Sequence, residues 1–440
     1  MRALLPFFVA SLAASAGRLG AQSPLPAPQG AGALTLQAAI ELGRSRGVQA
    51  ALARQGERIA DARVGQRRAD LLPSLGGSAS YTRQTRNLDE FGIAFATGVT
   101  DPFDLFNLQV KASQSLVDPA AWQRLRAARD SAVAAGLDTR NAGALAGAAA
   151  GVAWLRVLSG EETVRAREAD SATARSLRDQ ASQLLAAGVT AAIDLTRSDV
   201  NYNAIRSQLA VARNQRDRAR LDLARALDLP PGDPLAIAAG ADSVPLTVAA
   251  EPDSAVRFAL AHRPDLAAER KRLLALGTTH KAIRAEYLPS LGASGYWQES
   301  GRETSTIKST WLFQVGVNIP ILDGWRRQSR SAEQAARIAG EEIRLRDLAS
   351  QVEAEARQAL LDLRSAEDQV AIARERERLA QQELTQAEER FAAGVAGSLE
   401  TSNAQLNLTA ARDAAIQARV AYGVAKVGAL RALGILGGEQ

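Results

Sequence analysis

The chain of 440 residues has no cysteine and only two histidines, His262 and His280. Without cysteine it cannot form a disulfide framework, a thiolate nucleophile or a cysteine-ligated metal site. Two histidines are too few for a histidine-rich metal site. The sequence also contains neither a Gly-rich phosphate loop ending in Lys-Ser/Thr nor a Gly-x-Ser-x-Gly nucleophile motif. These absences predict no catalytic residue, no cofactor and no metal, and therefore a protein that is not an enzyme.

Long hydrophobic runs are also missing from the chain. Near the N-terminus, residues 4–16 form an apolar stretch that is too short to cross a bilayer and is typical of a secretory signal peptide. Small residues ending at Ala16 and at Ala21 offer two cleavage sites, and the longer signal occupies residues 1–21. The longest later stretch, 142–154, is shorter than the roughly 18–20 residues of a membrane helix. We therefore expect an exported chain without a membrane-spanning helix.

A long run of charge of one sign is absent as well. The net charge is +5, but positive and negative residues alternate along the helical segments, as they do in 375–378. Alternation of this kind is typical of a solvated helix face and differs from the basic stripe that follows a phosphate backbone. The sequence therefore predicts that nucleic acid is not a partner.

What the sequence does contain is an internal duplication. The motif Leu-Pro-Ser-Leu-Gly at 72–76 returns at 288–292, and Ala-Ala-Gly-Val at 186–189 returns at 392–395. The order is the same in both halves, and the distance is too long for a solenoid repeat. A whole folding unit is therefore duplicated. The predicted division of the chain is signal peptide 1–21, first repeat 22–229, proline-rich linker 230–253 and second repeat 254–440.

Each repeat contains two segments in which apolar and polar residues alternate. The four segments are 75–82, 106–113, 291–298 and 311–319. A period of two residues with one apolar face predicts β-strands. The strands are compatible with a soluble sheet over a core, or with a transmembrane barrel that has Tyr81, Trp297 and Trp311 near its rims. Four strands cannot close a barrel, because the smallest bacterial barrels have about eight. In lipid, the barrel would therefore have to be shared between copies of the chain.

Very long helices are predicted after each strand pair, because no proline interrupts the sequence there. Residues 119–187 as one helix would be about 100 Å long at 1.5 Å per residue, with Asp118 as its cap and Pro119 in its first turn. Further helices are predicted at 35–70, 192–228, 254–287 and 398–435. Apolar residues at spacings of three and four indicate coiled-coil seams, formed by Leu145, Ala148, Val152 and Leu155 in the first repeat and by Val352, Ala356, Ala359, Leu363, Ala366, Val370 and Ala373 in the second.

The ordered double set of motifs resembles the TolC-type outer membrane efflux proteins. The resemblance rests on the two LPSLG strand starts, the strand-to-helix passage at 114–118, the paired Ala-Ala-Gly-Val turns and the final helix at 430–434. It covers essentially the whole chain after the signal peptide. It implies a mainly α fold with a small β part, in which duplicated helical hairpins form an α-barrel wall. It also implies a homotrimer that joins four strands per chain into a twelve-stranded transmembrane β-barrel.

This resemblance implies a passive exit duct of a tripartite efflux or type I secretion system. The duct lies in the outer membrane, extends into the periplasm and conducts substrates from the periplasm or an inner-membrane pump to the exterior. Its implied partners are outer membrane lipid, the pump and a periplasmic adaptor of the membrane fusion protein class. The cargo stays open among drugs, metal ions, solvents and proteins. An alternative of another class is a periplasmic coiled-coil adaptor or scaffold that never enters lipid.

The resemblance also assigns candidate site residues at the periplasmic end. The two tight turns form the tip to which adaptor hairpins dock, and the residues concerned are Gly188, Val189, Gly394 and Val395. Glu400 matches the position of an acidic ring just inside the tip, and Asp194 is its counterpart in the first repeat. A second acidic position of some members is Asn403 here, which argues against a double ring. Three copies of Glu400 in a narrow pore would favour the passage of cations. The alternative is that Glu400 is an ordinary acid in the first turn of a helix and has no role in the pore.

Overall fold

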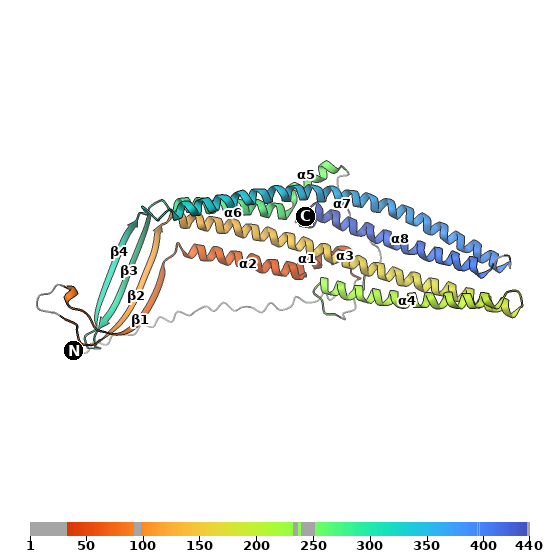
Figure 1. Ribbon diagram of the computed structural model, residues 1–440, viewed down its shortest axis with the longest axis horizontal. Helices are drawn as coiled ribbons and strands as arrows, with labels where there is room; N and C mark the ends of the chain where they lie inside the picture. Colours follow the sequence, from red (N-terminus) through yellow and green to blue (C-terminus); the bar gives the residue numbers. More distant parts are fainter. Residues whose placement is uncertain are drawn as a thin grey trace.

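The computed structural model describes residues 33–91, 98–231, 236–238, 251–303, 305–393, 395 and 397–437. The predicted signal peptide at 1–21 and most of the linker at 230–253 lie outside the described residues. Figure 1 shows a long rod with a sheet at one end and the turns of two helical hairpins at the other. The elements in chain order are α1 (Leu36–Arg46), α2 (Val48–Ala69), β1 (Ser74–Gln84), η1 (Asp89–Phe91), β2 (Phe103–Val117), α3 (Pro119–Ala186), α4 (Ala192–Ala226), α5 (Pro252–His262), α6 (Pro264–Ala285), β3 (Ser290–Gly301), β4 (Lys308–Asn318), α7 (Arg326–Ala392), α8 (Ser398–Ala432) and η3 (Ile435–Gly437).

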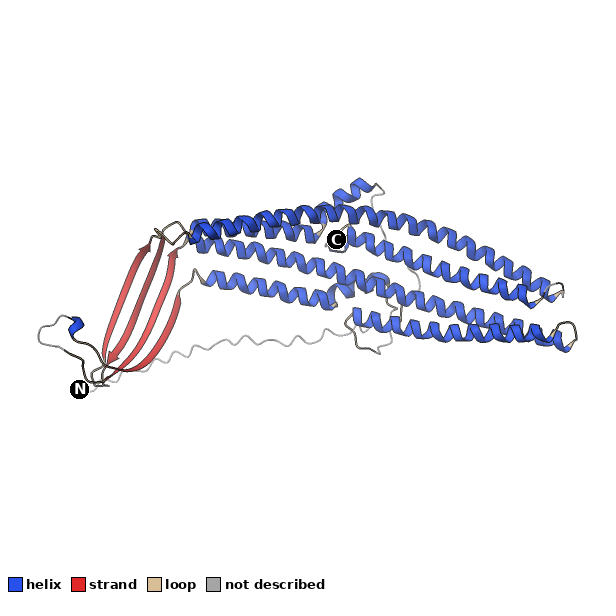
Figure 2. Ribbon diagram, viewed as in Figure 1, coloured by secondary structure: helices blue, strands red, loops and turns tan. Residues whose placement is uncertain are grey.

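The two halves of the chain have the same order of elements, which confirms the predicted duplicated, mainly α fold with a small β part. Each half runs through two short helices, two strands, one very long helix and one returning helix (Figure 2). The prediction of single helices at 35–70 and 254–287 was wrong, because each divides in two. The first division is at Gly47, whose backbone is extended, and the second is at Arg263, which precedes Pro264 and is pushed out of the helical region.

The four strands form one antiparallel sheet in the order β1-β2-β3-β4. The halves of the chain join through β2 and β3, in a register that pairs Gln109 with Gln298. Because side chains alternate along each strand, this register brings the apolar positions of all four strands to one face. That face carries Leu75, Tyr81, Phe106, Leu108, Val110, Trp297, Trp311, Phe313, Val315 and Val317. The predicted alternation is therefore confirmed, although the strands extend further than the sequence indicates.

The long helix α3 begins as its sequence predicts. The Asp118 carboxylate accepts a hydrogen bond from the Ala121 amide at 2.9 Å, and Pro119 occupies the first turn of α3. At the same point of the second half, the Asp323 carboxylate accepts hydrogen bonds from the amide and the Nε of Arg327, at 3.1 Å and 2.8 Å. With 68 and 67 residues, each of these helices is about 100 Å long at 1.5 Å per residue.

The core is thin and made largely of small residues. Trp154 of α3 is completely buried, and its indole Nε1 donates a 2.8 Å hydrogen bond to the Leu34 carbonyl. Around it α1 packs so closely on α3 that a Cβ added at Gly151 would lie 2.9 Å from Ile40. In α7 the predicted seam is confirmed, since its members are buried or half-buried. In α3 Leu145 is exposed, contrary to prediction, and it is the neighbouring Gly143 and Gly147 that pack against α1.

One described helix, α3, is apolar enough over part of its length to cross a membrane by length and composition alone. This finding differs from the expectation that no stretch of the chain reaches that length. The stretch is 61% buried against the rest of the chain. This part of α3 is apolar because α1, α4 and α8 pack against it. It therefore belongs to the helical wall.

Candidate functional site: the hairpin tips and the sheet

Both hairpin turns lie at the end of the molecule opposite the sheet (Figure 1). Gly188 has a φ of 72°, a left-handed conformation that favours glycine. The Val189 amide donates to the Leu184 carbonyl at 3.0 Å, and the Val395 amide makes the equivalent bond to the Arg390 carbonyl at 3.1 Å. These bonds close each helix end in the same way. The Val189 and Val395 side chains are 62% and 68% exposed, whereas the predicted tip residue Gly394 lies outside the described residues.

Asp194 occupies the first turn of α4 and connects the two hairpins. Its carboxylate accepts a 2.6 Å hydrogen bond from the Ser398 hydroxyl of α8 and a 2.7 Å bond from the Thr190 hydroxyl. These two bonds, that of Ser398 first, hold the pKa of Asp194 below its usual value. The carboxylate is therefore used in a contact between hairpins near the tip, an arrangement that the sequence analysis did not predict.

Glu400 lies in the first turn of α8, where the sequence analysis placed the acidic ring. Its Oε1 is 2.9 Å from the Nε of Arg390, which belongs to the last turn of α7. Both side chains are exposed, so water screens the pair and it adds little to stability. The guanidinium nevertheless offsets the charge of the carboxylate at this point. Asn403 follows one turn later on α8, so this helix carries a single acid there.

A buried polar cluster that the sequence analysis missed joins α3 to α8. Asp170 is 1% exposed and accepts hydrogen bonds from Arg167 at 3.0 Å, Arg412 at 2.6 Å and Thr409 at 3.0 Å. Arg167 also pairs with Asp413. A carboxylate with three donors is well compensated for its loss of water. Since Arg412 stands 242 positions away, no local pattern reveals this contact.

A second buried charged pair lies between α6 and α7. Glu269 and Glu341 are both buried, and each has an arginine on its own helix. Arg272 lies 2.5 Å from Glu269, and Arg344 lies 3.0 Å from Glu341. Burial, together with the hydrogen bond to Glu269 and its negative charge, raises the pKa of Glu341 above its usual value.

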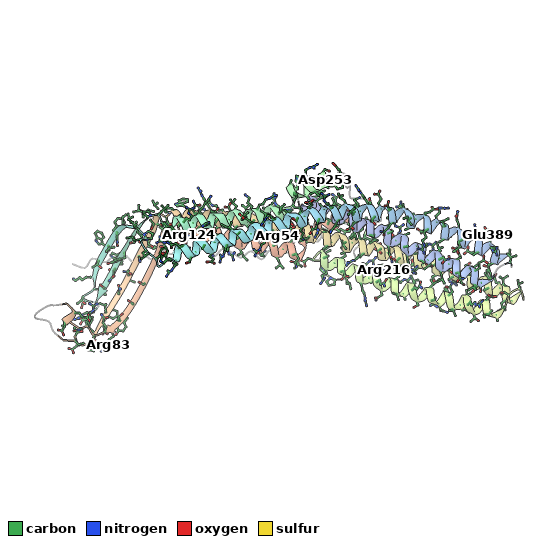
Figure 3. The ribbon with its side chains drawn as sticks, turned by 45° about the horizontal axis from the view of Figure 1, so that its top comes forward. Arg54, Arg83, Arg124, Arg216, Asp253 and Glu389 are labelled. Atoms are coloured by element: carbon green, nitrogen blue, oxygen red, sulfur yellow. The ribbon has the colours of Figure 1, made fainter. Side chains whose placement is uncertain are left out.

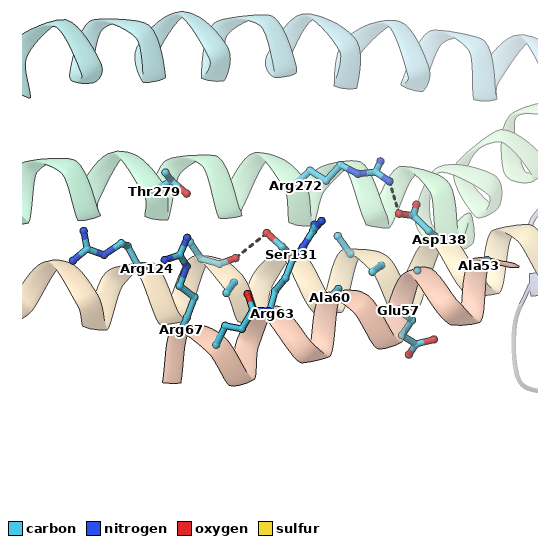
Figure 4. A pocket seen from close by; sticks show the side chains of 16 residues that line it. Ala53, Glu57, Ala60, Arg63, Arg67, Arg124, Ser131, Asp138, Arg272 and Thr279 are labelled. Carbon is cyan, nitrogen blue, oxygen red and sulfur yellow. Dashed lines mark hydrogen bonds and ion pairs between the residues drawn. The ribbon is translucent and has the colours of Figure 1, made fainter. Parts of the chain in front are cut away.

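A cavity of about 830 Å³ lies between α2, α3 and α6 (Figure 4). Small residues, such as Ala60 and Ser131, line part of its wall, and Arg63, Arg67 and Arg124 reach into it. Two arginines at its border are paired, Arg272 with Asp138 at 2.5 Å and Arg124 with Glu286 at 3.2 Å. In the part of the chain that the structure describes, no group of three or more His, Cys, Asp or Glu residues could hold a metal ion.

The sheet presents two chemically different faces. The apolar face includes Tyr81, whose hydroxyl donates a 2.7 Å hydrogen bond to Asp104 and whose ring lies 5.2 Å from that of Phe106. The other face is polar: Gln109 donates to Gln298 at 3.1 Å, and Ser74 contacts Ser113 at 2.8 Å. An exposed apolar band continues at the junction with the helices. Its members are Trp122, Ile321, Leu322 and Trp325, of which Ile321 is 90% exposed.

Exposed apolar side chains in this number need a cover, either lipid or protein. Figure 3 shows side chains along the whole rod, with Arg83 at the free end of the sheet and Glu389 near the tips of the helices. Charged residues therefore reach both ends of the molecule, and the exposed apolar face lies between the charged free end and the helices. This distribution is typical of a segment that crosses a bilayer.

Comparison with known proteins agrees with this geometry. Residues 36–228 and 255–434 match the family model described as outer membrane efflux protein. Among solved structures, the CmeC outer membrane channel of Campylobacter jejuni has a TM-score of 0.79 at 17% identity, over 91% of this chain and 85% of that one. VceC of Vibrio cholerae gives 0.76 at 16%, covering 91% and 96%. The open state of the Neisseria gonorrhoeae MtrE channel gives 0.74 at 20%, covering 91% and 88%.

Proposed function

The chain belongs to the outer membrane efflux protein family and is an outer membrane exit duct of tripartite efflux systems, and from this premise we propose how its parts assemble and work. It resides in the outer membrane and extends into the periplasm. We propose that it acts together with a periplasmic adaptor and an inner-membrane pump. We assign the sheet to the membrane, the long helices to the periplasm and the hairpin turns to the contact with an adaptor.

The observation that carries this proposal is a sheet that is apolar on one face and has two open edges, β1 and β4. β1 and β4 each have one neighbour among the described strands. In hydrocarbon the unsatisfied backbone groups of such edges would be very unfavourable, and only a closed barrel removes them. Three chains with four strands each give twelve strands, an even number within the range of bacterial barrels. We therefore propose a homotrimer in which β1 of one copy pairs with β4 of the next.

At the periplasmic end, we propose that the turns containing Gly188, Val189, Gly394 and Val395 contact the adaptor. Exposed valines at the ends of helical hairpins suit apolar contact with the helices of another protein. We further propose that Glu400 lines the aperture together with Arg390, while Asp194 supports the aperture by holding α4 against α8. In this role the chain conducts its substrate passively, and it requires neither catalytic groups nor a cofactor.

The experiment that tests the assembly is fractionation followed by a mass measurement. The protein expressed in a Gram-negative host should enter the outer membrane fraction, and after extraction in mild detergent it should have the mass of three chains plus detergent. A monodisperse monomer under those conditions would contradict the trimer. Recovery as a soluble periplasmic species without detergent would favour the adaptor or scaffold alternative instead.

A further inference from the structure

The polar face of the sheet carries positive charge and no negative charge. Its positions follow from the register and comprise Ser74, Gly76, Ser78, Ser80, Thr82 and Gln84 of β1, Phe103, Leu105, Asn107, Gln109, Lys111, Ser113 and Ser115 of β2, Ser290, Gly292, Ser294, Tyr296, Gln298 and Ser300 of β3, and Lys308, Thr310, Leu312, Gln314, Gly316 and Asn318 of β4. The strand acids Asp104 and Glu299 fall on the apolar face near the outer end. The polar face thus holds two lysines and, among its described positions, no carboxylate.

Lys111 is placed so that its charge is not hidden within the chain. It lies on β2, which has a neighbouring strand on both sides, so the face on which it stands is fixed within one copy. Its cross-strand neighbours are Gly76, which has no side chain, and Tyr296. The lysine is exposed, and no described carboxylate forms an ion pair with it. Lys308 lies at the outer end of β4, where Glu303 and Arg302 are close in the chain.

We propose that Lys111 makes the barrel lumen a section of the duct that favours anions, with a ring of three lysines near the middle of the strands. This inference rests on the proposed trimer, because the polar face borders a lumen only in a closed barrel. Charges that line a pore with low-dielectric walls change the local concentration of mobile ions. The class of solute favoured in this section is anionic, which is opposite to the preference expected of a bare Glu400 ring at the aperture.

A reporter inside the barrel tests the local potential independently of the aperture. Since the chain has no native cysteine, Gln109→Cys gives a single thiol on the same face as Lys111, about 7 Å away along the strand at 3.4 Å per residue. Its reaction rates with an anionic and a cationic methanethiosulfonate reagent are measured from outside, in liposomes at about 0.01 M salt, where the Debye length is near 30 Å. A unit charge about 7 Å away in water changes the local concentration of a monovalent ion by roughly threefold.

The expected result is that Lys111→Gln lowers the ratio of anionic to cationic reaction rates by about fivefold or more. Lys111→Arg should preserve the ratio, and Glu299→Gln, a charge change of the same size on the other face, should leave it unchanged. A ratio that is the same in the parent protein and in Lys111→Gln overturns the inference, even if the channel is intact. A thiol at 109 that reacts with neither reagent in a properly inserted trimer overturns the lumen assignment. Protein that forms no trimer contradicts the proposed function instead.

Discussion

The Asp170 carboxylate and its donors show how single residues hold the two hairpins together. The seams between the hairpins consist largely of alanine, whose small side chain buries little apolar area, so hydrophobic burial alone fixes their relative position weakly. A buried carboxylate with three directional donors adds a geometric constraint. Partners on both α3 and α8 therefore set the register between the first hairpin and the second.

Asp170→Ala should destabilise the helical wall by about 3–5 kcal/mol, because it leaves Arg167 and Arg412 without their buried acid. Thr409→Val is the matched control, since it removes one neutral donor and keeps the ion pairs, with an expected loss of about 1 kcal/mol. Denaturant unfolding of the detergent-solubilised protein, followed by helical circular dichroism, measures both. An Asp170→Ala loss no larger than that of Thr409→Val would contradict this account.

The buried Glu341 predicts a stability that depends on pH. Its pKa is raised in the folded chain by burial and by Glu269, so the stability it contributes is present at low pH and is lost as the pH rises through that raised pKa. Arg344 opposes this rise in the pKa of Glu341 but does not cancel it. Glu341→Gln should therefore raise the melting temperature at pH 8 and flatten its decrease between pH 5 and pH 8. An unchanged pH profile in the variant would show that another group is responsible.

The pairing of Glu400 with Arg390 predicts opposite effects of two neutralising variants. Arg390→Gln leaves three unopposed carboxylates at the proposed aperture and should raise the preference for potassium over chloride by a few-fold at low salt. Glu400→Gln leaves the guanidinium and should shift the reversal potential in the other direction. Planar bilayer recordings under a KCl gradient measure both variants. Equal reversal potentials in all three proteins would remove Glu400 from the aperture.

At the scale of elements, each hairpin turn exposes a valine shortly after the end of its long helix. The turns share the hydrogen bond that closes α3 and α7 but differ in the residues that follow. After the first turn, Asp194 accepts hydrogen bonds from Thr190 of its own hairpin and from Ser398 of α8, whereas after the second turn Glu400 pairs with Arg390 of its own hairpin. The two tips of one chain are therefore similar in backbone and different in chemistry.

Gly188→Val should impair export while trimers persist, because a β-branched residue at a φ of 72° is strained and distorts the proposed adaptor contact. Gly56→Val is the matched control, since Gly56 lies within α2, far from the tip, with no atom near an added Cβ. Susceptibility to an exported drug, together with trimer recovery, measures the effect. Normal export with Gly188→Val would argue against a role of this turn in adaptor contact.

Local sequence signals predicted the elements better than the contacts between them. The cap at Asp118 and the proline after it indicated the start of α3, and strand alternation indicated the two faces of the sheet. The break at Gly47 was missed because it depends on tertiary packing: an added Cβ would lie 2.5 Å from the Gly43 carbonyl and 2.9 Å from Ala146. The break before Pro264 could have been read from the proline itself.

The candidate site was predictable only in part, for the same physical reason. The turn glycines and Glu400 stand beside recognisable motifs, so their positions could be assigned from the sequence. The partners of Asp194 and Asp170 come from the other half of the chain, at 398 and 412. Side-chain pairing over such separations depends on how the hairpins pack, which no periodicity records. The repeat boundaries at 22–229 and 254–440 stay predictions.

At the scale of the whole molecule, the apolar face of the sheet and the exposed band beside it form the proposed membrane segment. A charge on that face should oppose insertion, whereas the same charge on the polar face should be tolerated. Phe313 and Gln314 are adjacent on β4, on opposite faces of the sheet, and Phe313 is 70% exposed in one copy. These neighbours offer a direct test of the orientation of the sheet.

Phe313→Arg should destabilise the barrel by about 2–4 kcal/mol per copy near the bilayer midplane, and it should reduce the amount of trimer in the outer membrane. Gln314→Arg adds the same side chain one residue later and should assemble normally. Outer membrane fractionation and unheated gel electrophoresis compare the two. Equal assembly of both variants, or a defect confined to Gln314→Arg, would reverse the assignment of the faces.

The two open edges of the sheet have a thermodynamic consequence. In the proposed trimer, the sheet gains its last rows of hydrogen bonds from association, so the folding free energy of its strands contains a mass-action term. Dilution of the protein within the bilayer should then act as a denaturant of the strands while leaving the helical hairpins formed. The stability of the strands should thus depend on the density of chains in the membrane, whereas the stability of a self-contained domain does not depend on its concentration.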